Sequence, residues 1–342
     1  MNRHWRVFRQ KDPGALLGIA QEALGNGDRA MAASALDRAY GLEPEHREVA
    51  GLRQSLLDEM SREHDGVTFR YVPGGYFLMG SERGEADERP VHPVFVKPFW
   101  MAETPVDWEW LSRGMGYKPP PWGMPEQGGF RAGFVWEIRQ QYCEDATERA
   151  SDWHNHYYEA IGEEAWPYRP QRPAVSHGYG QKPVVAVHLD EALEFCQRTR
   201  TRLPSEAEWE KAARGGLIQQ RYAWGEEPAT QDRCDFHRFE AFSLLPSRRF
   251  PANGYGLFHL CGGVWEWTST GYDALAYRGK WSFGLARQRV VRGGCWADCA
   301  EAVTVSFRNS RPTEGPANPN QGLRVCLAGI NSQEKPGKVR MV

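Results

Sequence analysis

The sequence lacks a long apolar run, a CxxC pair and an excess of charge of either sign. No stretch of its 342 residues is long enough to span a bilayer, and the N-terminus has no apolar segment of the kind found in signal peptides. Its 42 Lys and Arg residues nearly balance 44 Asp and Glu, so no global field attracts nucleic acid or acidic membranes. Seven scattered cysteines argue against a zinc ribbon and favour free thiols. We therefore expect a cytoplasmic protein that binds neither nucleic acid nor membrane.

Aromatic residues, glycine and proline are instead abundant. The chain has 14 tryptophans, 36 glycines and 23 prolines, and 41% of its residues are hydrophobic. Tryptophan gives large amphipathic contacts, and frequent glycine and proline favour loops over long helices. The composition therefore predicts a sizeable core inside an irregular, loop-rich fold. The length allows one large domain and a smaller one.

The first sixty residues have a helical pattern. Apolar spacing predicts two helices between residues 13 and 44, separated by Gly25-Asn26-Gly27-Asp28, and a third over about 45–63. The helix pair resembles a single tetratricopeptide repeat, which cannot bury its apolar face alone. We therefore interpret residues 1–64 as a helical arm that packs on the main domain. The alternative is that the arm binds a protein partner.

Residues 65–330 form the expected main domain, followed by a tail over 331–342. Asp190 is expected to cap one helix, and Ser205 with Glu208 forms a capping box for the next. Extended runs that predict strands cover residues 67–72, 76–80, 91–99 and 183–187.

The most distinctive stretch is GLFHLCGGVWEWT, over residues 256–268. In a strand, Trp265 and Trp267 point to one face and Glu266 to the other. Further phrases are RLPSEAEWE at 202–210, RGGCW at 292–296, SFRN at 306–309 and GLRV at 322–325. In this order they resemble the formylglycine-generating-enzyme (sulfatase-modifying factor) family, which also contains the C-terminal domain of the ergothioneine sulfoxide synthases. The resemblance covers residues 65–330.

The resemblance implies an α+β, C-type-lectin-like fold with little regular secondary structure. It also implies chemistry, because those enzymes bind copper(I) and a substrate thiol through two cysteines. The two cysteines lie four and nine residues after the Gly-Gly that matches Gly293-Gly294, where this chain has Asp298 and Val303. Standard formylglycine formation is therefore not expected.

A substitute catalytic pair is present nearby in the sequence. Cys295 and Cys299 are four residues apart and would share a face if the segment were helical, with Asp298 between them. The alternative is that cysteine fills the core there as a small apolar residue. We favour that alternative over a metal ligand.

The family's central stretch also binds calcium. Its ligands are an Asn before the VWEW phrase, backbone carbonyls and the Glu of the phrase. Here Gly263 replaces the Asn, and the remaining ligands are Glu266 and the carbonyls near Gly263 and Val264. Calcium needs several oxygen ligands. A structural calcium site is therefore expected to be weakened or empty.

Iron would need ligands of another origin. The C-terminal phrases are similar to those of ergothioneine sulfoxide synthases, whose iron is held by three histidines from an N-terminal bundle with a His-x-x-x-His-x-Glu helix. This chain has no such motif. His154 and His156, in a long insertion over 113–182, could face one way in a strand and bind a metal. The alternative, which we favour, is a surface loop with two solvated histidines.

The resemblance also implies a ligand groove. Trp265 or Trp267, Trp296, Arg308 and Arg324 would lie on it or just beneath it. An arginine over an aromatic wall suits a carboxylate, a peptide end or an oxyanion. The alternative is that the arginines form structural ion pairs, which we favour for Arg324 and leave open for Arg308.

Three functions fit these observations. The first is a divergent metal-dependent oxidase, with copper or iron, that acts on a peptide or a small thiol-like substrate. The second is a non-catalytic ligand- or protein-binding module on a C-type-lectin-like scaffold, as in the variable proteins of diversity-generating retroelements. The third is a subunit that docks on an enzyme through its helical arm. The retained framework, the Cys295/Cys299 pair and the histidine-rich insertion favour the first function, and the missing cysteines favour the second. We favour the first.

Overall fold

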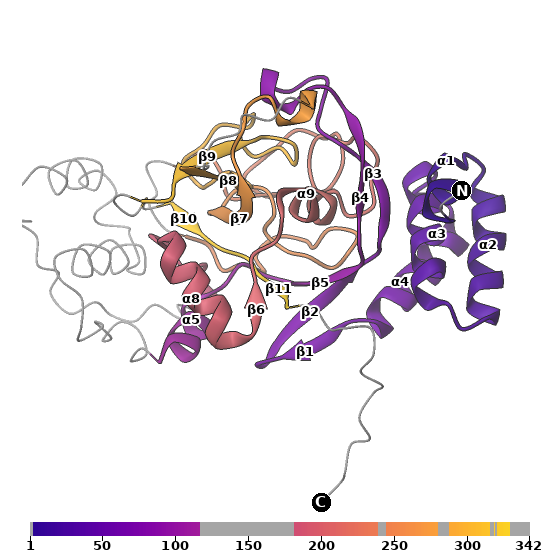
Figure 1. Cartoon of the computed structure of the whole chain (residues 1–342), viewed down its shortest axis with the longest axis horizontal. Coiled ribbons are helices and arrows are strands. Elements are labelled where there is room, and N and C mark those ends of the chain that lie inside the picture. The colour runs from indigo at the N-terminus through magenta and orange to yellow at the C-terminus, as the bar shows by residue number, and fades with distance from the viewer. Residues whose placement is uncertain are drawn as a thin grey trace, which may run out of the picture.

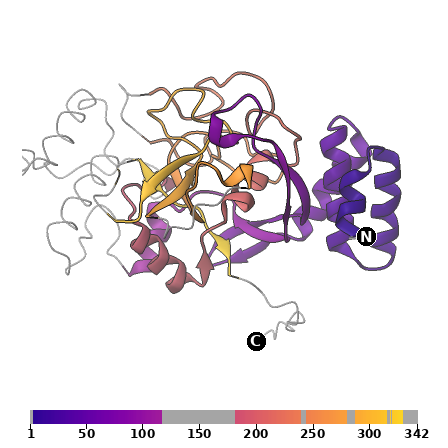
Figure 2. The same cartoon turned by 45° about the horizontal axis from the view of Figure 1, so that its top comes forward.

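The computed structural model describes residues 3–116, 181–238, 244–279, 287–314, 318 and 320–328. A helical arm at the N-terminus lies on one side of a body made of short strands, loops and a few helices (Figures 1 and 2). The predicted insertion over 113–182 and the predicted tail over 331–342 lie almost wholly outside the described residues.

The arm contains α1 (Arg3–Arg9), α2 (Pro13–Gly25), α3 (Arg29–Leu42) and α4 (Arg47–Glu59). The two helices expected between residues 13 and 44 are confirmed as α2 and α3. Asp12 and Asp28 cap them, because each side chain accepts a backbone N–H of the first turn. The expected third helix is shorter than 45–63, since the chain enters a strand at Arg62. Helix α1 was not predicted.

The strands are β1 (Arg62–His64), β2 (Val67–Val72), β3 (Gly75–Met79), β4 (His92–Val96), β5 (Phe99–Ala102), β6 (Thr201–Arg202), β7 (Trp265–Gly271), β8 (Gln288–Arg292), β9 (Asn309–Pro312), β10 (Gln321–Gly322) and β11 (Cys326–Leu327). In the described parts of the chain they form one sheet in the order β1-β2-β5-β11-β6, another in the order β10-β7-β8-β9, and a β3-β4 hairpin. Only β10 and β7 run parallel among these pairs.

Helices of the body are α5 (Trp108–Met115), α8 (Leu189–Thr199) and α9 (Glu206–Arg214), with short 3-10 turns η1 (Ala86–Glu88) and η4 (Ala276–Arg278). Helices α5 and α8 pack together on the side of the body away from the arm (Figures 1 and 2). The capping box of α9 is confirmed: Ser205 accepts the N–H of Glu208, and the Glu208 carboxylate accepts the N–H of Ser205.

Three local predictions are corrected by the structure. The run 91–99 is two strands, because the chain leaves the β3-β4 hairpin at Lys97-Pro98 and joins the larger sheet as β5. The run 183–187 is buried but is not a strand, because it forms only an isolated bridge between Pro183 and Asp107. At its other end, the backbone N–H of Val187 donates to the carbonyl of Gln321. Helix α8 begins after His188, so Asp190 lies in its first turn rather than at the cap.

Strand β7 separates two parts of the core. Trp265 and Trp267 pack in one apolar cluster with Phe195. Glu266 faces the other cluster and accepts a hydrogen bond from the indole of Trp209. The predicted alternation is confirmed, and both faces of the strand are buried.

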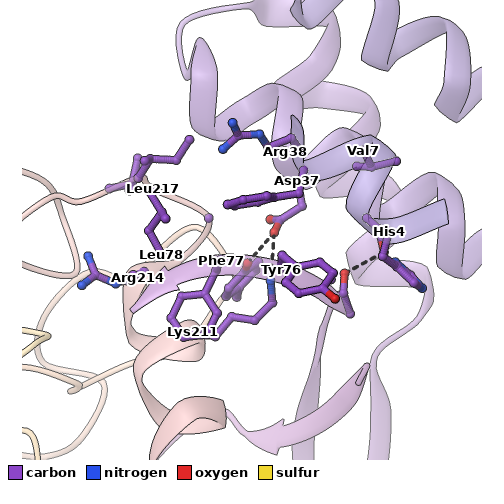
Figure 3. A pocket seen from close by; sticks show the side chains of 17 residues that line it. His4, Val7, Asp37, Arg38, Tyr76, Phe77, Leu78, Lys211, Arg214 and Leu217 are labelled. Atoms are coloured by element: carbon purple, nitrogen blue, oxygen red, sulfur yellow. Dashed lines mark hydrogen bonds and ion pairs between the residues drawn. The ribbon is translucent and has the colours of Figure 1, made fainter. Parts of the chain in front are cut away.

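The arm packs on the body, as expected, through α1, α3 and α4, and Asp37 of α3 takes part in its buried polar contacts. The Arg53 guanidinium pairs with Asp37 at 2.9 Å and also donates to the carbonyls of Gly215 and Gly254 in the body. Asp37 accepts the hydroxyl of Tyr255 and faces Lys211, which comes from α9, beside a cavity of about 50 Å³ (Figure 3). The arm is thus joined to the body by one buried ion pair, Asp37 with Lys211, and by the hydrogen bonds of Arg53 and Tyr255, as well as by apolar contacts.

Candidate functional site

The segment after Gly293-Gly294 forms a turn, not a helix. The N–H of Asp298 donates to the carbonyl of Cys295 at 3.1 Å, and the Asp298 carboxylate accepts the N–H of Cys295 at 2.7 Å. Cys295 and Cys299 therefore do not share a helical face, which was the condition for treating them as a pair.

The two cysteines differ in environment. Cys295 is fully buried, and its Sγ accepts the side-chain amide of Asn320 at 3.2 Å. Burial raises the pKa of the Cys295 thiol well above its usual value, and the Asp298 carboxylate adds to the shift. Cys299 is exposed. A thiol held in its protonated form is a poor nucleophile and a poor metal ligand, so Cys295 has the properties of a core residue.

Asp298 and Val303 are the residues that the resemblance placed at the positions of the family's copper cysteines. Val303 is fully buried and lies against Gly294, where a Cβ would come within 2.7 Å of its Cγ1. A valine side chain has no atom that can bind a metal. Burial raises the pKa of the Asp298 carboxyl, and its oxygen is committed to the turn. Copper(I) prefers soft thiolate ligands, so these two residues do not fit it.

Glu266, the expected calcium ligand, is 1% exposed and is already paired. The Arg324 guanidinium donates to both carboxylate oxygens at 2.9–3.1 Å, and Trp209 Nε1 donates to Oε2 at 2.6 Å. Arg324 also donates to four backbone carbonyls, those of Ala102, Glu103, Phe258 and His259. A fixed guanidinium therefore takes the position that a cation would need, and Arg324 is the structural partner that the sequence favoured.

The place of the missing Asn is taken by an imidazole. Gly263 has φ +79°, and a Cβ built on it would lie 2.4 Å from Nε2 of His259. The carbonyl of Gly263 accepts the N–H of Trp296. No side-chain oxygen is offered at this position, and calcium requires several oxygens. The residues present around Glu266, Gly263 and Val264 do not fit a calcium ion.

The predicted groove tryptophans lie in the core. Trp265, Trp267 and Trp296 are 1%, 4% and 2% exposed. The indole of Trp267 donates to the carbonyl of Val187 at 2.8 Å. The guanidinium that lies over the Trp265 ring, at 5.6 Å from its centroid, belongs to Arg311, which sequence reasoning missed.

Arg308 is also buried and is held by other parts of the body. Its Nε donates to Glu206 at 2.6 Å, and its Nη1 donates to the carbonyls of Asp87 and Asp273. Its guanidinium lies 4.3 Å from the ring centroid of Tyr277. These contacts tie the segment just before β9 to α9, to η1 and to the loop at Asp273, which is the structural role that the sequence left open.

Two predicted metal ligands, His154 and His156, lie outside the described residues. Within the described ranges, no group of three or more His, Cys, Asp or Glu side chains is placed to hold a metal ion. In that same part of the chain, no helix is both long enough and apolar enough to cross a membrane.

This chain is similar in sequence to proteins of one known family. Residues 54–328 match the family described as the sulfatase-modifying factor enzyme 1-like domain. The chain is 32% identical over 304 residues to the "Inactive C-alpha-formylglycine-generating enzyme 2" of Bos taurus, covering 80% of this chain and 91% of that protein. It is 31% identical over 277 residues to the "Formylglycine-generating enzyme" of Streptomyces coelicolor, covering 74% of this chain and 87% of that protein.

A third relative is much longer. The chain is 30% identical over 267 residues to the "Serine/threonine-protein kinase pkn1" of Chlamydia caviae. The match covers 76% of this chain but only 38% of that protein, so the chain spans well under half of its length. Among solved structures, the "Treponema denticola variable protein 1" has a TM-score of 0.53 at 17% identity and covers 79% of this chain and 98% of its own.

The chain therefore carries a C-type-lectin-like fold of mixed helices and curled sheets. It belongs to the formylglycine-generating-enzyme (sulfatase-modifying factor) family, as a divergent member.

Proposed function

We propose that this chain is a non-catalytic member of its family and that its domain is a binding module for a ligand or a protein partner. The observation that carries the proposal is the pair of residues at the copper-cysteine positions, Asp298 and Val303. A buried valine side chain has no ligand atom, and the nearby Cys295 thiol is held protonated by burial. The described residues thus lack the sulfur pair on which the family's oxidation depends.

The scaffold around these positions is nevertheless intact. Gly293 and Gly294 have positive φ angles, Glu266 and Arg324 form a buried pair, and Arg308, just before β9, binds Glu206 of α9. A binding module needs a rigid scaffold of this kind but does not need the copper-binding thiols. The relative from Bos taurus carries the word "inactive" in its name, whereas the Streptomyces relative, at nearly the same identity, is named an enzyme. Overall identity therefore does not separate the two functions, and the proposal rests on the residues at positions 298 and 303.

The test restores the missing sulfurs. The double variant Asp298→Cys/Val303→Cys should bind one copper(I) per chain in a titration against a chromogenic chelator, and the natural chain should not. The double variant Asp298→Asn/Val303→Ala is the matched control for the loss of packing. Oxygen uptake with cysteine-containing peptides should be absent from the natural chain.

The competing oxidase has a clear signature. Stoichiometric copper or iron in the purified natural chain, together with oxygen uptake that is lost on Cys295→Ala or His154→Ala, would overturn the proposal. The two single variants also distinguish a thiol-based copper site from an iron site in the insertion.

A further inference from the structure

A pocket of about 270 Å³ opens beside the stretch 256–268, and neither Asp298 nor Val303 lines it. It lies between the loop 223–233 and the loop 250–261. One water takes about 30 Å³ of liquid, and sites for drug-sized molecules begin near 300 Å³. The pocket is therefore suited to one small ring-bearing group rather than to an extended ligand.

His259 lines this pocket and is its unusual residue. Its side chain is buried, with 6% of the residue exposed, and neither ring nitrogen has a hydrogen-bond partner in the structure described. Leaving a buried polar group unpaired costs about 1–3 kcal/mol. The backbone at His259 also has φ +58°, which is uncommon for a residue other than glycine. Such a combination of unpaired polarity and backbone strain is found more often at binding sites than in ordinary cores.

The surrounding residues hold the imidazole in its neutral form. Burial lowers the pKa of His259 to about 3, and the Arg324 charge adds to the shift. Arg324 donates to the carbonyl of His259 at 3.2 Å and is itself fixed by Glu266. Gly263 leaves the space that the ring occupies. A neutral imidazole offers one N–H donor and one nitrogen acceptor.

The other walls are apolar or aromatic. Phe250 lies 5.9 Å from the His259 ring, between centroids, and is tilted by 52°. Trp224 is partly exposed and stacks on Tyr222 at 4.8 Å. Burial raises the pKa of the Cys261 thiol, at the base, to about 12, so this group is uncharged. Further apolar lining comes from Leu257 and Leu260.

Charged groups lie at the margin of the pocket and have both signs. Asp232 is exposed, and Arg233 forms an ion pair with Glu227. The amide of Asn253 is fully used, because it donates to the carbonyl of Ala212 and accepts the N–H groups of Tyr255 and Leu257. Nε2 of His259 lies against Gly263, so Nδ1 is the unpaired ring nitrogen left for a ligand. The interior carries no net charge that would select an ion.

We propose that this pocket binds a neutral aromatic group that carries an O–H or N–H, of the phenol or indole type, and that this group hydrogen-bonds to His259. The ring lies among Phe250, Trp224 and Leu257, and its polar hydrogen is directed to the free ring nitrogen. The ligand can be a free small molecule or the Tyr or Trp side chain of a peptide, since both present the same chemistry. The proposal needs no catalysis, so it stands or fails separately from the copper test.

The test compares p-cresol with toluene, which has the same ring and methyl group but no hydroxyl. Ligand-observed NMR titration of the full chain should give saturable binding of p-cresol with a Kd of about 1 mM or tighter. Toluene should bind about tenfold more weakly. The variant His259→Phe keeps a ring but has no hydrogen-bonding group, so the preference for p-cresol should fall to about onefold. A ratio of two affinities is insensitive to a small loss of folded protein.

A second variant covers the case in which His259→Phe does not fold. Ala252 is half-buried and lines the pocket. Ala252→Trp should fill the space and abolish the binding of both probes while leaving the imidazole in place. Absence of saturable binding to the natural chain, or a p-cresol preference that survives His259→Phe, would overturn the proposal.

The source of the aromatic group is decided by a second pair of probes. N-acetyltyrosinamide carries the peptide groups of a tyrosine within a chain. Tighter binding of N-acetyltyrosinamide than of p-cresol identifies a peptide side chain, since the polar margin then contributes. Weaker binding identifies a free small molecule. Either result supports the aromatic class, provided that His259→Phe weakens the tighter probe by about tenfold.

Discussion

Glu266 and His259 lie seven residues apart in one stretch of sequence, but they differ in how their polar atoms are hydrogen-bonded. Both are buried. Glu266 receives donors from Arg324 and Trp209 on both oxygens, whereas neither nitrogen of His259 has a partner in the structure described. Burial alone therefore does not separate a structural polar group from a binding group, but the number of partners does.

Gly263 and Arg324 account for the difference between these two residues. With glycine at 263, the His259 ring enters the space next to the strand, and the Arg324 guanidinium neutralises Glu266 without a metal ion. The carboxylate that the family uses for calcium is retained here as half of an ion pair. The buried atoms without hydrogen-bond partners here are the two ring nitrogens of His259.

The largest effect is expected where a paired group is removed at the arm. Asp37 is the anion for both Arg53 and Lys211, and its side chain is about nine-tenths buried. Asp37→Asn leaves two buried cations without their counter-charge and should cost about 4–5 kcal/mol of unfolding free energy. Urea unfolding measures this loss. The control is Glu194→Gln, which breaks an exposed pair with Arg198 and should leave the midpoint unchanged.

A smaller loss is expected at Glu266. Glu266→Gln removes the negative charge but keeps a carbonyl acceptor, and Arg324 retains its four backbone carbonyls. We expect a loss of about 3 kcal/mol, at the lower end for a broken buried pair. Calcium at millimolar concentration should not raise the thermal midpoint of the natural chain. A clear rise that disappears in Glu266→Gln would show that the carboxylate is a calcium ligand after all.

Much of the fold could be predicted because it depends on local chemistry. The capping box of Ser205 and Glu208, the alternation across β7 and the packing of the arm follow from residue type and spacing. The split of residues 91–99 and the isolated bridge at Pro183 could not be predicted in the same way. Each depends on which distant strand the backbone meets, and the sequence pattern of an extended run is the same in both cases.

The candidate site was less predictable for a different reason. The sequence identified Gly263 as a change from the family, but it contained no sign that His259 would fill the vacated space. The placement of the His259 ring depends on the left-handed backbone at His259, on Arg324 and on the loop that carries Trp224. These three parts are far apart along the chain. The signal that could have found it was the pairing of an unusual His with an unusual Gly four residues later.

The smallest effect is specific to His259 and depends on pH. Burial and the Arg324 charge lower its pKa to about 3 in the folded chain, whereas an unfolded imidazole titrates near 6.5 (roughly). Between these values the unfolded chain binds a proton that the folded chain does not. The stability linked to the neutral imidazole is therefore complete above about pH 6.5 and is lost as the pH falls, at up to about 1.4 kcal/mol per pH unit.

His259→Asn removes this titration and tolerates the left-handed backbone. Urea unfolding at pH 7 and pH 5 should show that the natural chain loses about 2 kcal/mol more than His259→Asn over this interval. Other titrating groups, such as Asp107, whose pKa burial raises to about 6, are present in both proteins and cancel in the difference. An equal loss in the two proteins would mean that His259 is protonated or solvated when folded. In that case the contrast with Glu266, and the neutral pocket built on it, would not hold.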